Sequence, residues 1–552
     1  MIKYMKPTSI LFACLFLPLF MLAQNGHEIK VKADGFKGHK CLLAYHYGPK
    51  QYIQDTVEVT SDWIVFKGDE KLKGGIYLVV FPPENKYFEI MVADDQHFSL
   101  ETKMEDFVKY MKVTGSKENK VFYDDLNFLS EQRQKAQPFR DKIAAWEKSM
   151  MPEESEDPDA EPQPKPEIED TPEITKLREK LVEIDAGVKA QRVKVMKENP
   201  DLFYSKLLGA MKEPEVPEEV PETDENGNKI DEREYKRNYY LSHYFEDTDF
   251  GEQRLLRTPV LHRKVFQYVT KLTLQHPDSV IRVVDMLVTN FRGDINAFKK
   301  DKGETYKLRL QEDKLQKQLG EATNASDSAM IQGQIDELGK KLQPLIDNHE
   351  SFKYFVVMLL NEYGKSKIMC MDKVYVHMVK KYYMTRDALW ATEKQIREME
   401  KRALFMEPTL CDKVAPNINI PDEGGTPISL HAVPERYTIL YFWDYDCGHC
   451  KKVTPKLAQM YKKFKGKGIA WYNVSVNGDN EIWKEKLKEY EIDGINTADP
   501  KRKTGFDGLY DLRSTPKVFI LDENKKIIAK QLTVEQIEKL LNELLEEDKN
   551  RK

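Results

Sequence analysis

A pair of cysteines two residues apart, in the sequence CGHC at residues 447–450, stands between an apolar run and an amphipathic segment. The run at residues 437–443 (YTILYFW) is rich in aromatic and branched side chains, which predicts a buried parallel strand. Residues 451–464 carry apolar side chains at helical spacing, which predicts a helix. Cysteines at a helix N-terminus can close a small disulfide, and the helix dipole and free backbone N–H groups favour a thiolate there. The junction therefore predicts a site of thiol–disulfide exchange.

Downstream residues extend this pattern into a resemblance to the thioredoxin superfamily. Pro455 lies inside the predicted helix, and Thr515-Pro516 comes just before an apolar strand predicted at residues 517–521. Together with the CGHC sequence, these features resemble a thioredoxin over about residues 411–545. The resemblance implies that Pro516 is cis, and that the backbone before it offers an edge to an extended substrate.

The rest of the C-terminal region resembles the TlpA/ResA-like branch of that superfamily. Residues 412–430 predict a short hairpin similar to the N-terminal addition of this branch, and residues 469–476 predict a second core strand. A last helix is predicted to begin at Thr533, with Gln536 three residues on, which is a capping box. This order of elements predicts a C-terminal α/β thioredoxin fold.

The position of each motif residue suggests a role. Cys447, at the start of the helix, is the expected nucleophile, and Cys450, one turn further, is expected to resolve the mixed disulfide. A charged His449 would stabilise the thiolate and make the pair more oxidising, and histidine here resembles disulfide isomerases. An exposed polar filler is the alternative role for it. Gly448 and Trp443 complete the expected surroundings of the pair.

Three positions depart from the family pattern. Asp446 stands where the family usually has tryptophan before the first cysteine, and a carboxylate there should raise the pKa of that thiol. Tyr441 replaces the buried acid of thioredoxins, and Val453 replaces a glutamate found in some secreted relatives. Asp444 is therefore a candidate proton acceptor for the second cysteine. These departures affect the expected rate and direction rather than the type of reaction.

Other uses of a CxxC pair fit the sequence less well. Half of a zinc site would need a second CxxC or a His-x₃₋₅-His pair, which the sequence lacks. Attachment of a c-type haem needs histidine after the second cysteine, where Lys451 stands. A peroxiredoxin would have a Pro-x-x-x-Thr-x-x-Cys motif, which is absent, and a passive structural disulfide is unusual at a strand–helix junction. We expect neither a metal nor a cofactor.

The N-terminus reads as a secretory signal over residues 1–23. Lys3 and Lys6 make a basic start, and residues 10–22 are apolar but short for a membrane span. A lipoprotein signal ending at Cys14 is the weaker alternative. The sequence therefore predicts a location in the periplasm or cell envelope. A net charge of −6 without a basic stripe argues against nucleic acid as a partner.

The cysteines outside the motif are Cys41, Cys370 and Cys411 once the predicted signal is removed. Together with the CGHC pair they make an odd number, which argues against a scaffold held together by disulfides. A bridge between Cys370 and Cys411 is one alternative, but the sequence favours unpaired, partly buried thiols.

The chain is long enough for several domains, and its patterns predict a multidomain α+β protein. Residues 24–115 alternate as in an antiparallel β-sandwich and resemble the β-domain that often precedes TlpA-like thioredoxins. Residues 116–405 are predicted to be helical, with acidic, proline-rich loops at 152–172 and 213–232. Residues 406–552 make the thioredoxin-like domain.

These features predict a secreted, TlpA/ResA-like thiol–disulfide oxidoreductase acting on disulfide-containing envelope proteins. The resemblance implies reduction by a membrane thiol reductant of DsbD/CcdA type, although the oxidase or isomerase direction stays open. The alternative is an envelope binding or scaffold protein with an accessory thioredoxin unit, because most of the chain shows no chemistry of its own. Oligomerisation through the β or helical domain fits either interpretation.

Overall fold

The computed structural model describes residues 26–151, 169–476, 480–499 and 501–550. The predicted signal segment and most of the first acidic loop lie outside the described residues. The chain divides into two compact units, Met1–Arg263 and Lys264–Lys552, which are described here one at a time.

The first unit begins with two four-stranded sheets that form the predicted β-sandwich. The strand orders are β4-β1-β7-β8 and β3-β2-β5-β6. The strands are β1 (His27–Asp34), β2 (Lys40–Tyr47), β3 (Lys50–Glu58), β4 (Ile64–Gly68), β5 (Gly75–Phe81), β6 (Lys86–Val92), β7 (His97–Lys103) and β8 (Lys112–Thr114). Alternate residues such as Ile29, Val31 and Leu43 are completely buried, as the two inner faces of a sandwich require.

The prediction of a purely antiparallel sandwich is wrong for one pair of strands. β1 runs parallel to β7, with Glu28 opposite His97, and antiparallel to β4. The N-terminal strand occupies an inner place in its sheet, and its neighbours come from later parts of the chain. Alternation along a strand fixes which face is buried but leaves the identity and direction of a distant neighbour open.

The remainder of this unit is mostly helical, and a polar contact fixes its first helix to the sandwich. The helices are α1 (Lys117–Met150), α2 (Pro172–Glu198), α3 (Phe203–Met211) and α4 (Glu232–His243). Ser116 caps α1, and the buried side-chain amide of Asn119 bonds to both the N–H and the carbonyl of Met91 on β6. Residues 213–231 carry no helix or strand and contain one isolated bridge, between Thr223 and Lys229.

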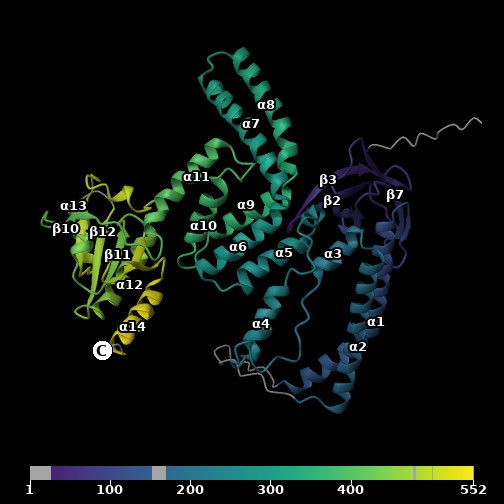
Figure 1. Ribbon diagram of the computed structural model, residues 1–552, viewed down its shortest axis with the longest axis horizontal. Coiled ribbons are helices and arrows are strands. Elements are labelled where there is room, and N and C mark those ends of the chain that lie inside the picture. The colour runs from purple at the N-terminus through teal and green to yellow at the C-terminus, as the bar shows by residue number, and fades with distance from the viewer. Residues whose placement is uncertain (1–25, 152–168, 477–479, 500, 551–552) are drawn as a thin grey trace, which may run out of the picture. The chain divides into compact units, whose positions relative to one another are not determined.

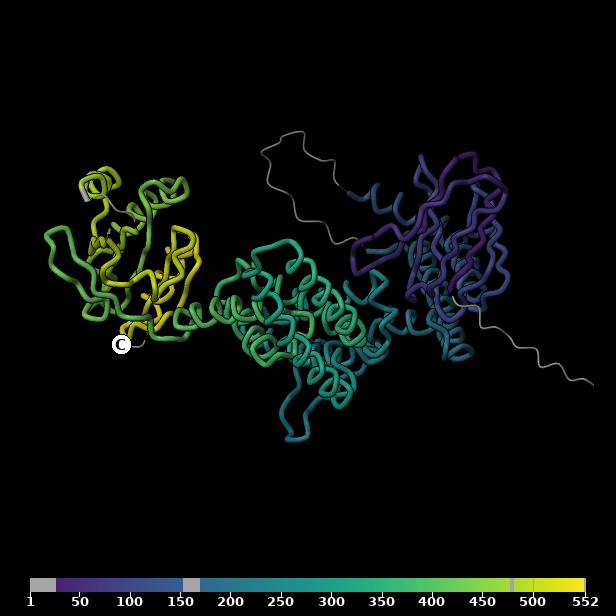
Figure 2. The backbone as a smooth tube through the Cα atoms, turned by 90° about the horizontal axis from the view of Figure 1, so that it is seen from above, coloured from purple at the N-terminus to yellow at the C-terminus, as the bar shows by residue number. Residues whose placement is uncertain are grey.

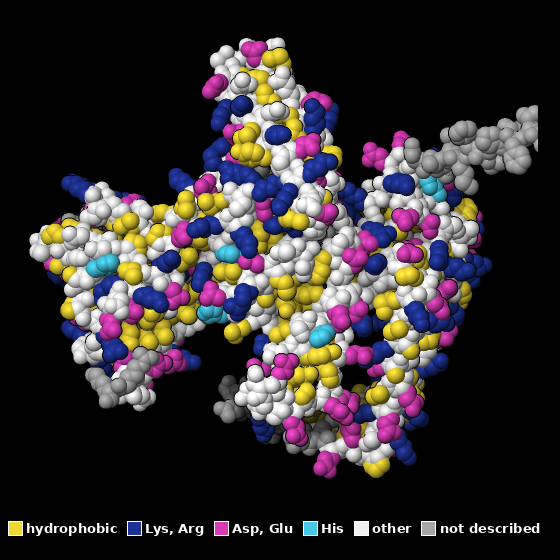
Figure 3. Space-filling view, in the orientation of Figure 1, with side chains coloured by type: hydrophobic (Ala, Val, Ile, Leu, Met, Phe, Trp, Pro, Cys, Tyr) yellow, Lys and Arg dark blue, Asp and Glu magenta, His cyan; other side chains and the backbone are white. Residues whose placement is uncertain are grey.

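The second unit begins within α5, because the division between the units falls inside this helix, and it continues as a helical region. The helices are α5 (Pro259–Gln267), α6 (Pro277–Arg292), α7 (Ile295–Glu321), α8 (Ala325–Asp347), α9 (Glu350–Gly364), α10 (Asp372–Met378) and α11 (Glu393–Met406). Helices α7 and α8 lie side by side as a long hairpin (Figure 1). On the face drawn in Figure 3, basic and acidic side chains are interspersed over the α7–α8 hairpin.

The C-terminal part is a five-stranded sheet in the order β13-β12-β11-β14-β15. The strands are β11 (Tyr437–Trp443), β12 (Ile469–Ser475), β13 (Ile495–Ala498), β14 (Lys517–Leu521) and β15 (Ile527–Lys530), with a side hairpin of β9 (Asn419–Pro421) and β10 (Pro427–Ser429). Its helices are α12 (Gly448–Lys462), α13 (Asn480–Glu489) and α14 (Val534–Asn550). Figure 2 shows the late strands and α14, in yellow, beside the green strands β11 and β12. The predicted fold class, with β-sandwich, helical middle and thioredoxin fold, is confirmed.

Both faces of the central strand β11 are covered, which explains why its sequence is apolar at every position. Ile439, Tyr441 and Trp443 belong to one hydrophobic cluster, and Leu440 and Phe442 belong to another. Successive residues of a strand point to opposite faces, so the two clusters lie on opposite sides of the sheet. β11 is parallel to β12 and antiparallel to β14, as the thioredoxin fold requires.

Two of the cysteines outside the CGHC sequence are joined. Cys370, between α9 and α10, forms a disulfide with Cys411, which precedes the thioredoxin sheet. The expectation of unpaired thiols is therefore wrong for these two residues, and it holds for Cys41, which is free and buried. The bonded cysteines are 41 positions apart, and only tertiary packing brings them together.

Candidate active site

The loop after β11 brings the CGHC sequence to the N-terminus of α12. The strand ends at Trp443, and Cys447 is the residue that precedes the first helical residue, Gly448. Its carbonyl accepts the N–H of Lys451, which begins the helix, while the backbone N–H groups of the first turn have no helical partner. Cys450 follows one turn later, so both thiols face a helix end that favours negative charge.

Cys447 is half-buried and surrounded by hydrogen-bonding groups. Its Sγ lies 3.4 Å from the carbonyl oxygen of Thr515. Partial burial alone would raise the pKa of this thiol, but hydrogen bonds from the backbone N–H of Cys450, from Thr515, from the Cys450 thiol and from the backbone N–H of His449 outweigh it. The pKa of Cys447 therefore lies below its ordinary value of 9.0, which favours the nucleophilic thiolate.

Cys450 has the opposite environment. It is completely buried, and this burial raises the pKa of its thiol to about 11, although the backbone N–H of Asp444, 3.5 Å from the sulfur, opposes the shift. Tyr441, in the position of the thioredoxin acid, places its hydroxyl 2.9 Å from Thr454 Oγ1. Burial raises the pKa of this phenol above its ordinary value, so Tyr441 stays neutral beneath the second cysteine.

Three polar residues, Asp444, Asp446 and His449, adjoin the cysteine pair. His449 is exposed, and its backbone N–H contributes to the lowered pKa of Cys447. The Asp444 carboxylate accepts the N–H of Asp446 at 2.8 Å, which shapes the turn between strand and helix. Asp446 is exposed, and the net pKa of Cys447 is lowered in spite of this neighbouring carboxylate. The roles assigned to these three side chains stay predictions.

The remaining predicted site residues surround the thiols. The Thr515–Pro516 peptide bond is cis, as the resemblance implied. Pro455 lies inside α12, and Trp443 is completely buried in the same hydrophobic cluster as the second cysteine. Gly448 has open space where a Cβ would stand and no left-handed φ, so the backbone does not require glycine there.

Sequence reasoning missed one ring close to the pair. Tyr490, just after α13, has its ring centroid 6.2 Å from that of Trp443. Partial burial and the Glu489 carboxylate raise the pKa of its hydroxyl, and a Cys450 thiolate would add a smaller contribution. The aromatic character of residues 483–490 was visible in the sequence, but nothing there connected it with the cysteines.

The site has the parts that two-step thiol chemistry needs. A partly exposed thiol with a lowered pKa can attack, and a shielded thiol with a raised pKa can then resolve the mixed disulfide.

Across the described ranges, no three His, Cys, Asp or Glu side chains are grouped so that they could hold a metal ion. No helix in the described part of the chain has both the length and the apolar character to cross a bilayer.

Comparison with family models matches three parts of the chain. Residues 411–530 match the AhpC/TSA family. Residues 27–122 and 189–303 match two domains of unknown function, DUF4369 and DUF5106.

Comparison with known proteins finds thiol-disulfide oxidoreductases that match about a quarter of the chain. The thiol-disulfide oxidoreductase ResA of Bacillus cereus is 27% identical over 135 residues, which is 24% of this chain and 77% of the relative. ResA of Bacillus subtilis is 29% identical over 114 residues, 21% of this chain and 63% of the relative. Among solved structures, a domain of a possible thiol-disulfide isomerase from Cytophaga hutchinsonii is 37% identical and covers 26% of this chain and 97% of its own, with a TM-score of 0.24.

Proposed function

We propose that the protein is a thiol-disulfide oxidoreductase of ResA type and that Cys447 and Cys450 carry its reaction; residues 411–530, which match the AhpC/TSA family, form its thioredoxin-fold domain. The observation that supports this most directly is the opposite tuning of the two thiols at the N-terminus of α12. The substrates would be disulfide-containing proteins of the cell envelope.

The reaction proceeds in two exchanges. The Cys447 thiolate attacks one sulfur of a substrate disulfide, forms a mixed disulfide, and releases the other substrate sulfur as a thiolate. Cys450 then loses its proton and attacks Cys447 Sγ, which releases the second substrate thiolate. The substrate gains two electrons, and the enzyme is left with a Cys447–Cys450 disulfide. Because burial raises the pKa of Cys450, its deprotonation is the demanding part of the second step.

The surroundings support placement of the substrate. The Thr515 carbonyl lies beside Cys447 Sγ, so an extended substrate could pair with the backbone that precedes Pro516. His449, when protonated, would add positive charge at the rim of the site. Asp444 is the proposed proton acceptor for the second cysteine, through the turn that already places its backbone against that sulfur.

The proposed location is the periplasm or cell envelope. The basic and then apolar residues 1–23 support export. The Cys370–Cys411 disulfide supports it independently, since disulfides persist in oxidising compartments. A membrane thiol reductant of DsbD/CcdA type would return Cys447–Cys450 to the dithiol. In this arrangement residues 24–115 and 116–405 would place the thioredoxin domain or select its substrates.

The decisive experiment equilibrates the protein in graded thiol/disulfide buffers and counts alkylated Cys447 and Cys450 by mass. We expect a reversible two-electron transition. A midpoint near about −270 mV indicates a reductase, and one of roughly −120 to −180 mV indicates an oxidase or isomerase. Absence of a transition would mean that the CxxC pair is not redox-active, and the scaffold interpretation would then be preferred.

Variants separate the roles of the two cysteines. Cys450→Ser should accumulate mixed disulfides with envelope proteins through Cys447, whereas Cys447→Ser should form none. Cys41→Ser is the matched control, because it removes a buried free thiol of β2 and should leave trapping unchanged. Equal trapping by both active-site variants would contradict the assignment of the nucleophile.

A further inference from the structure

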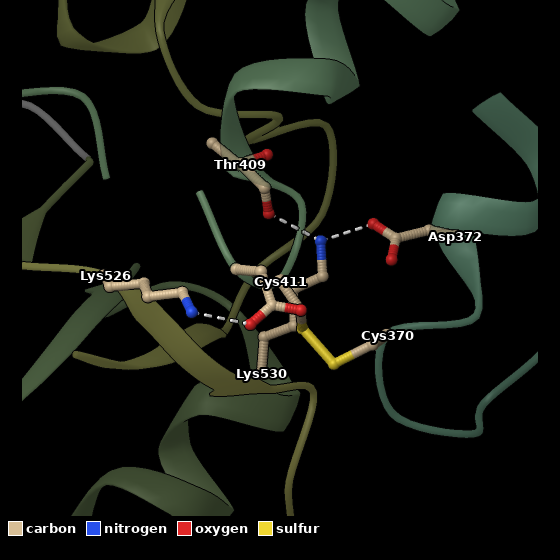
Figure 4. Close-up of a disulfide and its surroundings, with 7 residues drawn as sticks. Cys370, Asp372, Thr409, Cys411, Lys526 and Lys530 are labelled. Atoms are coloured by element: carbon tan, nitrogen blue, oxygen red, sulfur yellow. Dashed lines mark hydrogen bonds and ion pairs between the residues drawn. A yellow bond between two sulfur atoms is a disulfide. The ribbon is translucent and has the colours of Figure 1, made fainter. Parts of the chain in front are cut away.

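The disulfide outside the active site joins the helical region to the thioredoxin domain. Cys370 lies between α9 and α10, Cys411 leads into the thioredoxin domain, and each is more than nine-tenths buried (Figure 4). Both belong to the hydrophobic cluster that includes Ile527 of β15. Cys450 belongs to the cluster on the other face of the sheet. The molecule therefore keeps two cysteine pairs on opposite sides of one sheet.

A buried charge crosses the same junction. Lys530, the last residue of β15, is only 4% exposed, and its ammonium group donates to the Asp372 carboxylate and, at 2.7 Å, to the Thr409 carbonyl. Asp372 comes two residues after Cys370, and Thr409 two residues before Cys411 (Figure 4). The segment that carries Cys370 and Asp372 is thus joined to the segment that carries Thr409 and Cys411 in two ways: by the disulfide, and by the Lys530 ammonium group, which bonds to both segments.

The two links depend on each other. An ammonium group that is removed from water needs its charged partner, and its desolvation lowers the pKa of Lys530. If the turn that carries Cys370 moved away, Asp372 would leave with it and the buried charge would lose its counterion. The disulfide prevents this movement, and the ion pair holds the sulfur-bearing segments in bonding distance.

We propose that Cys370–Cys411 is a second redox site, a lock whose reduction by a dithiol releases the start of α10 from β15. A thiolate of the reductant attacks one of the two sulfurs, forms a mixed disulfide and frees the other cysteine. The second thiol of the reductant then closes its own disulfide and frees the first cysteine. Two electrons and two protons pass from the dithiol to Cys370 and Cys411. This site does not depend on the proposed exchange at Cys447.

Burial sets the order in which the two pairs respond. A reductant can reach the half-buried Cys447, but it reaches the bridge only after the junction opens. We therefore expect the bridge to be reduced more slowly, and at a lower potential, than the active-site pair. The lock stays closed while the active site cycles and opens only under a strong reductant.

The test uses the full chain with Cys447→Ser and Cys450→Ser, so that only the bridge exchanges electrons. Graded dithiothreitol buffers, alkylation and mass counting give the redox state of Cys370 and Cys411, and hydrogen exchange reports on α10. We expect a reversible two-electron transition, with exchange in residues 366–378 at least tenfold faster after reduction. Exchange in β11 should stay unchanged.

Lys530→Met and Lys526→Met form a matched pair of variants. Lys530→Met removes the buried ammonium group. Lys526→Met, four positions earlier in the chain, removes an exposed ion pair with Asp412. With the bridge intact, Lys530→Met should speed its reduction about 100-fold, whereas Lys526→Met should leave the rate at that of the parent.

Several results would overturn the lock. Free thiols at Cys370 and Cys411 in the oxidised protein would remove its basis. Reduction without faster exchange in α10 would show that the bridge holds nothing in place. Reduction only together with faster exchange in β11 would make the bridge a static staple of the whole fold. Equal reduction rates in Lys530→Met and Lys526→Met would show that the charge and the bridge act separately.

Discussion

The opposite environments of Cys447 and Cys450 predict a large difference in their alkylation rates. Only the thiolate reacts, so the rate at a given pH follows the fraction of each thiol that is ionised. With a pKa of about 11, roughly one Cys450 in ten thousand is a thiolate at pH 7, since 10 to the power 7 − 11 is about 10⁻⁴. Cys447, with a pKa below 9.0, exceeds about 10⁻². We expect Cys447 to react at least about 100-fold faster.

The assay is a pH series of brief iodoacetamide pulses on the reduced protein, with each cysteine followed by peptide mass. The rate at Cys447 should reach half of its plateau value at a pH below 9.0, because its pKa is lowered. The rate at Cys450 should still be rising there. Cys41, whose pKa burial raises to about 12, is an internal reference that should stay almost unlabelled.

Two results would refute this reasoning. Equal rates at Cys447 and Cys450 near neutral pH would show that burial does not hold the second thiol protonated. A rate at Cys447 that reaches half of its plateau value only above pH 9 would show that the hydrogen bonds at the N-terminus of α12 do not outweigh its desolvation.

Three further substitutions test the packing by native-state hydrogen exchange. Tyr441→Phe removes the hydroxyl bonded to Thr454 and should weaken protection of α12 by about 1 kcal/mol; unchanged protection would contradict the value of that bond. Tyr204→Phe leaves buried Asp125 without its 2.6 Å donor and should lower protection of α3 by about 1–3 kcal/mol, and a smaller change would mean that water replaces the donor. Lys530→Met leaves the Asp372 carboxylate without its ammonium partner and should lower the protection of α10 by about 3 kcal/mol. Unchanged protection would mean that the Asp372 carboxylate becomes solvated.

The thioredoxin domain could be predicted closely because its signals are local. The apolar run at residues 437–443 is the strand β11 with the same bounds, since a central strand buried on both faces must be apolar throughout. The capping box at Thr533 and Gln536 forms both of its reciprocal hydrogen bonds. In each case the residues that carry the signal are neighbours in the chain, so tertiary packing had little to add.

What the sequence could not provide depends on contacts between distant residues. The parallel pairing of β1 with β7 and the bond between Cys370 and Cys411 each need the fold before they can be seen. The tuning of Cys447 is a subtler example. The sequence suggested two sources, the helix N-terminus with its free backbone N–H groups and the His449 side chain, but it could not show that Thr515, 68 positions away, and the Cys450 thiol also lower the pKa of Cys447. Backbone groups are present at every residue, so only their geometry makes them functional.

The second unit contains two cysteine pairs that we expect to differ in how readily they exchange electrons, Cys447/Cys450 readily and Cys370–Cys411 slowly. Cys447 is partly accessible and its thiolate is stabilised, so we expect exchange at this pair to be fast. Cys370 and Cys411 are buried on the opposite face of the sheet, with a charged group across their junction. Access and local charge, rather than the chemistry of the S–S bond itself, therefore separate the two. An enzyme whose substrates are disulfides needs such a separation, because otherwise its own Cys370–Cys411 bridge would compete with the substrate for Cys447.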